Sequence, residues 1–458
     1  MKKRINHTAS FKDPAARVFY LEGDEGYFYR ELSPSYLSHY HQFKSSGLAA
    51  LLIEKNWLLP FEELIGNNEP LVLKTRRINF ISYPYEWTFN QWKDAALLTL
   101  KIQHQALKHG MILKDATPFN IVFDGSKPLF VDISSFEIYT EGRPWQAFKQ
   151  FCENFYIPLL LLKYFDATGN EIYLNNINGI TVNKGLSLLP SKAYFNFNNI
   201  FFLAMPGRIR AQLKSKPHQY FSKSITIKNL VQFTEQLFNS IHKLRQTKMQ
   251  TKWNDYYDKN IDAAYLQEKD AVIKKWIDTN YENKILIDFG CNTGHFSKLA
   301  APFVQTVIAF DADMRSAGEL YIHCKEQKIN NIFSFAASLV NPTPAMGWNN
   351  EERLSLKERM RGDIGLALAL VHHLAVGNHI QFDMMADFFA ATCNELIIEF
   401  VPLNDDKVQL IMNGREAIFE WYNRDNFIWS FSRKFSLIKE HTFSNKRQLF
   451  HFASKKDE

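Results

Sequence analysis

The hydrophobic pattern of the first half of the chain mixes short strands with helices. Alternating apolar residues bounded by turn residues predict strands, and apolar residues repeated every three or four positions predict helices. The expected strands lie within 17–31, 71–83, 121–123 and 129–131, and the expected helices within 35–56, 89–109 and much of 145–245. This order of elements predicts an α+β domain.

Strands and helices alternate regularly in the second half. Such alternation predicts a parallel sheet covered by helices. After a helix at 263–278, the alternating elements are expected at 284–289, 297–303, 306–310, 316–327, 331–336, 364–370, 384–393 and 395–400. Two last strands, 436–443 and 447–454, are separated only by the turn around Asn445 and predict an antiparallel pair at the edge of the sheet.

Length and composition support two domains of ordinary globular character. A chain of 458 residues is too long for one hydrophobic core, and 46% of its residues are hydrophobic. The segment 243–252 is polar and basic, so we place the boundary there and assign 1–245 and 246–458 to the two domains. The net charge is +6, and the basic residues form short clusters, which disfavours a dedicated nucleic-acid interface.

The cysteines and the apolar runs favour the cytoplasm. The four cysteines are far apart and form no Cys-x-x-Cys pair, which argues against a disulfide framework and against a structural zinc site. The N-terminus lacks the apolar segment of a signal peptide, and no apolar run is long enough to span a bilayer. We therefore expect a cytoplasmic protein with no membrane span.

The segment 285–296 (ILIDFGCNTGHF) has the pattern of a cofactor-binding turn. An apolar strand runs into a glycine turn and then a helix, so a ligand can approach the backbone and the free N–H groups of the helix. Dinucleotide-binding turns have the spacing Gly-x-Gly-x-x-Gly, whereas this turn carries Asp288 two residues before Gly290. A carboxylate there disfavours a pyrophosphate and suits a cationic amino-acid group.

This turn resembles motif I of class I S-adenosylmethionine (SAM)-dependent methyltransferases. The resemblance implies a Rossmann-like fold and a SAM site at Asp288, Gly290, Asn292 and Gly294. Asn292 stands where that family often has glycine, and asparagine tolerates unusual turn dihedrals. A glycine turn that binds no ligand is the alternative.

Two further segments extend the expected SAM site. The strand 306–310 leads to Asp311, our first choice for the carboxylate that binds the ribose hydroxyls, with Asp313 as second choice. For Asp313, capping of the following helix is the alternative. The family commonly has an acid near the adenine amino group, and Ser338 stands near that place.

His372 and His373 follow the fourth expected strand of the sheet. Ligands lie at the carboxyl ends of parallel strands, so these histidines are candidates for a base or for orienting the methyl acceptor. Packing or loop histidines are the alternative. No Asn/Asp-Pro-Pro-Tyr motif occurs, which disfavours methylation of a base or of a glutamine amide.

The first half also carries a motif with possible chemistry. The segments LKDATPFNIVF and FVDISS place Asp115, Asn120 and Asp132 around the predicted hairpin. They resemble the catalytic loop and the metal-binding aspartate of the protein kinase and aminoglycoside phosphotransferase superfamily. The resemblance implies ATP, with Asp115 as the catalytic acid–base residue and Asn120 and Asp132 as Mg²⁺ ligands.

The first half departs from that superfamily in ways that leave its activity open. It has no Gly-x-Gly-x-x-Gly loop, and Arg30 stands where the phosphate-binding lysine is expected. Ile133 and Ser134 replace the usual phenylalanine and glycine after the metal-binding aspartate. A pseudokinase that is structural or binds a nucleotide is therefore an alternative to an active kinase.

The combination of both halves resembles a bacterial group of two-part proteins that includes the host-specific nodulation methyltransferases of rhizobia. The segments that carry this resemblance include PWQAFKQFCENF, WNDYYDK, GWNNEERLSLKERMRGD, LALVHHL and IIEFVP. It implies a SAM-dependent methyltransferase whose acceptor is a glycan, a glycolipid precursor or another small molecule. The alternatives are a bifunctional kinase–methyltransferase, an RNA methyltransferase and a binding protein that uses SAM as a signal.

Overall fold

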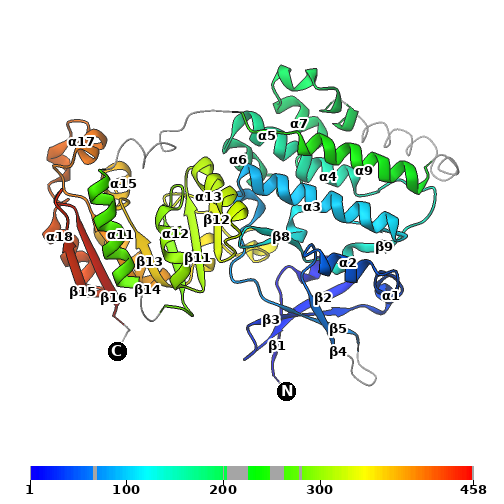
Figure 1. Ribbon diagram of the computed structural model, residues 1–458, viewed down its shortest axis with the longest axis horizontal. Helices are drawn as coiled ribbons and strands as arrows, with labels where there is room; N and C mark the ends of the chain where they lie inside the picture. The colour runs from blue at the N-terminus through cyan, green and yellow to red at the C-terminus, as the bar shows by residue number, and fades with distance from the viewer. Residues whose placement is uncertain are drawn as a thin grey trace. The chain divides into compact units, whose positions relative to one another are not determined.

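The computed structural model describes residues 2–64, 70–199, 201–203, 225–247, 262–277 and 281–455 (Figure 1). Its contacts divide the chain into an N-terminal unit, Met1–Met249 with Glu351–Arg353, and a C-terminal unit, Gln250–Asn350 with Leu354–Glu458. The expected boundary at 245–246 lies close to this division. The segment WNDYYDK, at 253–259, lies outside the described residues.

The N-terminal unit begins with a five-stranded antiparallel sheet of order β1-β2-β3-β5-β4. Its strands are β1 (Arg4–Asn6), β2 (Ala16–Leu21), β3 (Tyr27–Leu32), β4 (Phe61–Leu64) and β5 (Val72–Arg76). The strands expected within 17–31 are confirmed as the β2–β3 hairpin. The strand expected within 71–83 ends already at Arg76, and β4 was not predicted.

Helices make up most of the remainder of the N-terminal unit. Its described α-helices are α1 (Leu37–Ser45), α2 (Leu48–Glu54), α3 (Phe89–Lys108), α4 (Phe148–Phe151), α5 (Ile157–Phe165), α6 (Thr168–Leu174), α7 (Val182–Leu188) and α9 (Ile227–His242). The helix expected at 35–56 is split in two by Gly47, whose φ is +80°. The central helix, α3, buries most of its length, with Trp92 fully enclosed.

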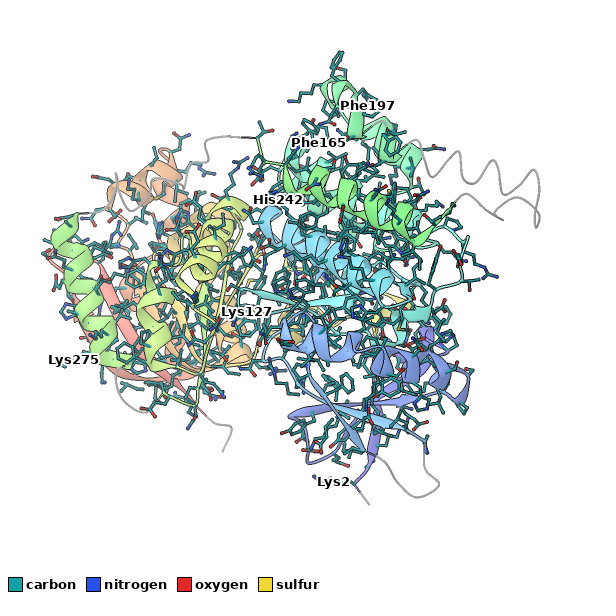
Figure 2. The ribbon with its side chains drawn as sticks, turned by 45° about the vertical axis from the view of Figure 1, so that its right-hand side comes forward. Lys2, Lys127, Phe165, Phe197, His242 and Lys275 are labelled. Carbon is teal, nitrogen blue, oxygen red and sulfur yellow. The ribbon has the colours of Figure 1, made fainter. Side chains whose placement is uncertain are left out.

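Two short strand pairs lie beside α3. β6 (Met111–Leu113) pairs with β9 (Phe136–Ile138), and β7 (Ile121–Asp124) pairs with β8 (Lys127–Phe130) as the predicted hairpin. Figure 2 marks the hairpin turn at Lys127. Asp115 and Asn120 lie between β6 and β7, and Asp132 follows β8, so this arrangement brings the three residues to one region of the unit.

The C-terminal unit is built on a seven-stranded sheet of order β12-β11-β10-β13-β14-β16-β15. Its strands are β10 (Ile285–Phe289), β11 (Thr306–Asp311), β12 (Ile332–Ala336), β13 (Gly362–Ala367), β14 (Cys393–Phe400), β15 (Phe435–Thr442) and β16 (Gln448–Ser454). The first five pair in parallel, and β16 pairs antiparallel with both β14 and β15. The predicted parallel sheet with an antiparallel edge pair is confirmed, and the fold is Rossmann-like.

Helices cover both faces of this sheet. The α-helices described in this unit are α11 (Ala263–Ile277), α12 (His295–Ala300), α13 (Met314–Gln327), α14 (Leu356–Arg359), α15 (Val371–Asn378), α16 (Phe382–Thr392), α17 (Asp406–Met412) and α18 (Arg424–Ser432). Leu286 of β10 shares a buried cluster with residues of α11, α12 and α13. Phe289 points to the other face, where its ring contacts Phe388 and Phe389 of α16. Lys275 marks the exposed side of α11 in Figure 2.

Within the described part of the chain, no helix combines the length and the apolar character needed to cross a membrane.

Candidate functional site

The glycine turn of the C-terminal unit has the backbone shape that the sequence predicts. Gly290 and Gly294 have φ values of +76° and +74°, and Asn292 between them has +50°. A Cβ atom on Gly294 would lie 2.3 Å from Cδ1 of Leu320. Glycine is therefore required at position 294 for α12 to pack against α13, and asparagine accommodates the left-handed conformation at position 292.

Asp288 lies in β10 just before this turn and is 3% exposed. Its carboxylate accepts a hydrogen bond from the hydroxyl of Ser297, a residue of α12. Burial raises the pKa of Asp288 to about 6, the nearby Asp311 carboxylate adds to the rise, and Lys269 opposes it. A buried carboxylate of this kind gains energy when a cationic group binds beside it.

Asp311 ends β11 and connects two backbone segments at the carboxyl edge of the sheet. Its Oδ2 accepts a hydrogen bond from the Asn292 amide at 2.8 Å, and its Oδ1 accepts one from the Asp313 amide at 2.8 Å. Burial raises the pKa of Asp311. The carboxylate thus stands directly beside the glycine turn, and its oxygens keep lone pairs for further donors.

Asp313 has the helix-capping role that was its alternative. Its Oδ1 accepts a hydrogen bond from the Arg315 amide at 3.0 Å, and its Oδ2 accepts one from the Ser316 hydroxyl at 3.0 Å. Ser338 follows β12 and is half-buried, and its hydroxyl accepts a hydrogen bond from the Asn341 amide at 3.3 Å. Both residues lie near the same edge of the sheet as Asp311, because they follow adjacent strands.

His372 and His373 lie in the first turn of α15, directly after β13. The centres of the two rings are 4.2 Å apart. His372 is 1% exposed, and its Nδ1 has no hydrogen-bond partner among the described residues. Burial lowers the pKa of both histidines, and His373 adds to the effect on His372. Both imidazoles are therefore neutral near pH 7.

A buried ionic cluster beside these histidines was not predicted from the sequence. Glu399 of β14 is fully buried, and its carboxylate accepts hydrogen bonds from the Tyr265 hydroxyl, from Lys269 Nζ at 2.6 Å and from the Ala369 amide at 2.7 Å. Although burial opposes it, the charges of Lys269 and Arg447 hold the pKa of Glu399 below its usual range.

This cluster explains where β13 ends. Ala369 has a φ of +51°, a left-handed conformation that alanine rarely adopts, and its amide is bound by Glu399. The strand expected at 364–370 therefore stops at Ala367, and α15 begins at Val371. Glu399 holds the turn that leads directly to His372 and His373.

In the N-terminal unit, the three candidate residues of the phosphotransferase-like motif lie close to one another. Burial raises the pKa of Asp115, and the negative charge of Asp132 adds to the rise. Asn120 Nδ2 donates a hydrogen bond to the Ser135 hydroxyl at 3.0 Å, and this hydroxyl donates to Asp132 Oδ2. Asp132 also forms an ion pair with Arg30 of β3.

Comparisons with known proteins give one similar curated protein and many similar structures. No protein-family model matches the chain. The chain is similar to the nodulation protein NoeA of Rhizobium meliloti (strain 1021), at 29% identity over 97% of this chain and 95% of that protein.

Two of the similar structures are methyltransferases. The N-methyltransferase NodS of Bradyrhizobium japonicum WM9 has 10% identity and a TM-score of 0.31, over 43% of this chain and 99% of that one. The magnesium protoporphyrin IX methyltransferase ChlM of Synechocystis PCC 6803, with bound S-adenosylhomocysteine (SAH), has 15% identity and a TM-score of 0.33. That match covers 44% of this chain and 91% of ChlM.

Proposed function

We propose that the C-terminal unit is a SAM-dependent methyltransferase. The observation that carries the proposal is the pair of carboxylates, buried Asp288 and half-buried Asp311, on the two sides of a left-handed glycine turn at the carboxyl edge of a parallel sheet. Ligands of open α/β sheets bind at this edge, next to the first strand–turn–helix. The cationic amino group, the ribose and the compact methionine chain of SAM match this set of groups.

Each residue of the turn has a distinct role in this proposal. Asp311 accepts hydrogen bonds from the ribose hydroxyls, and Asp288 faces the amino group of the methionine part. Gly290, Asn292 and Gly294 keep the backbone open to the cofactor, with Asp313 and Ser338 at the border of the site. SAM, when bound, supplies an electrophilic methyl group on a sulfonium.

The acceptor side of the proposed site contains His372 and His373. Their neutral imidazoles can accept a hydrogen bond from a hydroxyl or an amine and orient its lone pair, and a ring nitrogen can take the proton that the acceptor loses. The burial of His372 keeps water away from this position. The contribution of the enzyme is therefore orientation and exclusion of water.

The acceptor is proposed to be a small molecule, a glycan or a glycolipid precursor. This choice keeps the acceptor class that the sequence resemblance of both halves implies, and the similarity to the nodulation protein NoeA likewise extends over nearly the whole chain. We further propose that the N-terminal unit has a kinase-like fold that serves recognition. Support comes from its antiparallel sheet of order β1-β2-β3-β5-β4, followed by helices and two short strand pairs.

Calorimetric titration of SAM into the full chain tests the proposed function. The parent is expected to bind SAM, and Asp311→Ala is expected to weaken binding by about 100-fold or more, because two charge-assisted hydrogen bonds are lost. Asp363→Ala is the matched control. Asp363 also accepts a hydrogen bond from a backbone amide, that of Ile285 at 2.8 Å, but it lies at the start of β13, at the edge of the sheet opposite to the proposed site. Absence of binding by the folded parent, or equal weakening by both variants, would contradict the proposal.

A further inference from the structure

Asp132 of the N-terminal unit already has a cation at its carboxylate. Arg30 Nη1 donates to Asp132 Oδ1 and, at 2.8 Å, to the Ser134 hydroxyl, while Nη2 donates to the Val131 carbonyl at 3.0 Å. The two charged side chains are 16% and 19% exposed. Both terminal nitrogens of the Arg30 guanidinium thus donate hydrogen bonds to the turn that follows β8.

The other oxygen of Asp132 is also engaged. The Ser135 hydroxyl donates its single proton to Asp132 Oδ2, so it can only accept from the Asn120 amide. Asn120 must therefore present its nitrogen to Ser135. The side-chain amide of Asn120 is thus oriented with its nitrogen, and not its oxygen, towards Ser135. The Ser135 hydroxyl lies between this nitrogen and the Asp132 carboxylate.

A second cation lies near Asp132 besides Arg30. Asp13, which precedes β2, lies against the Ser134 hydroxyl, and Lys114 Nζ lies 3.8 Å from Asp13 Oδ1. Arg30 and Lys114 therefore each face one carboxylate of this cluster, Asp132 and Asp13 respectively, and Asp115 is a further carboxylate nearby. Mg²⁺ needs nearly ideal octahedral oxygen ligands and is repelled by a guanidinium bound to the same carboxylate.

The first α-helix after β3, α1, offers Arg30 no carboxylate. In protein kinases, the phosphate-binding lysine pairs with a glutamate of a helix that follows its strand, which leaves the aspartate to the metal ion. Here α1 has the sequence LSHYHQFKS and carries no acidic residue. The carboxylate partner of Arg30 in this structure is Asp132.

We infer that the Arg30 guanidinium takes the place of a divalent metal ion at Asp132, so that the N-terminal unit does not carry out metal-dependent phosphoryl transfer. The residues that the sequence suggested as Mg²⁺ ligands, Asn120 and Asp132, do not fit that ion in their present contacts. Their hydrogen bonds instead tie β3 and the segment before β2 to the turn after β8. This ionic cluster is a structural connection within the unit.

Binding of Mn²⁺, a paramagnetic substitute for Mg²⁺, tests the inference. Free Mn²⁺ is measured by electron paramagnetic resonance as the full-length chain is added to MnCl₂ and ATP. The parent and Asn120→Ala are expected to leave the free Mn²⁺ signal equally unchanged; Asn120→Ala keeps the Arg30–Asp132 pair. One Mn²⁺ bound per chain by the parent and lost in Asn120→Ala would overturn the inference. Neither outcome depends on SAM binding, so the proposed methyltransferase is tested separately.

A double-mutant cycle tests the internal ion pair directly. Arg30→Met and Asp132→Asn are each expected to raise the unfolding equilibrium constant by roughly 100-fold, because each leaves one partly buried charge without its partner. The double variant should lose much less than the product of the two effects. Arg76 and Asp124 form a more exposed pair, 47% and 30% exposed, and serve as the control, with nearly independent effects. Independent effects at Arg30 and Asp132 as well would overturn the inference.

Discussion

Replacing Gly294 by alanine should destabilise the C-terminal unit through two separate effects. The φ of +74° is a left-handed conformation, which costs a residue with a Cβ about 1–2 kcal/mol. The added Cβ would also lie 2.3 Å from Cδ1 and 2.6 Å from Cδ2 of Leu320, which is fully buried and has to repack. Overpacking of this kind costs about 1–3 kcal/mol, so the total loss is about 2–5 kcal/mol.

Gly414→Ala separates the two effects. Gly414 has a φ of +76° in the same unit, but a Cβ there would meet no atom within 4 Å. Its substitution should therefore cost only the backbone strain, about 1–2 kcal/mol. Hydrogen exchange of peptides covering β10 and β11, measured by mass spectrometry, reports the free energy of unfolding of this unit. Equal losses for both variants would refute the contact between Gly294 and Leu320 as the reason for glycine.

Two further predictions concern the buried carboxylates. Because the pKa of Asp288 is raised to about 6 and an ammonium group binds its charged form, SAM affinity should be constant above about pH 7 and fall by about tenfold per pH unit below 6. Calorimetry between about pH 5 and 8 checks this, and a flat profile would exclude Asp288 from contact with the amino group. Lys269→Met should destabilise the C-terminal unit by about 3–5 kcal/mol, because Glu399 remains buried without its ammonium partner. Adding Glu399→Gln should recover part of that loss in the same hydrogen-exchange measurement, whereas simply additive losses would argue against the pair.

The parallel sheet was predictable because its strands are continuous apolar runs. Leu286 and Ile287 point to opposite faces of β10 and are both fully buried, so the strands contrast clearly with the amphipathic helices between them. The glycine turn was also predictable from local sequence. Gly290 and Gly294 adopt positive φ values, which glycine accommodates best, so their spacing after an apolar strand already indicates the turn.

The ionic cluster at Glu399 was not predictable, because its members are far apart in the sequence. Tyr265 and Lys269 lie one helical turn apart, which is the only local signal, and Arg447 comes from the turn between β15 and β16. Glu399 is an acid within an apolar strand, a pattern that indicates a buried partner without identifying it. The end of β13 depends on this contact, so it was wrongly expected at residue 370.

The Arg30–Asp132 pair shows a related limit of reading a motif. The spacing of Asp115, Asn120 and Asp132 matches a metal-binding pattern, but Arg30 comes from a strand about 100 residues earlier. Whether a carboxylate binds a metal or an internal cation depends on that distant residue, and the local spacing is the same in both cases.

A crystal structure of the chain grown with SAH tests the central claim most directly. The account predicts SAH at the carboxyl edge of β10 and β11, with its ribose hydroxyls on the Asp311 carboxylate and its amino group facing Asp288. SAH bound elsewhere, or a folded chain whose glycine turn stays empty at saturating SAH, would contradict the assignment of the C-terminal unit as a methyltransferase.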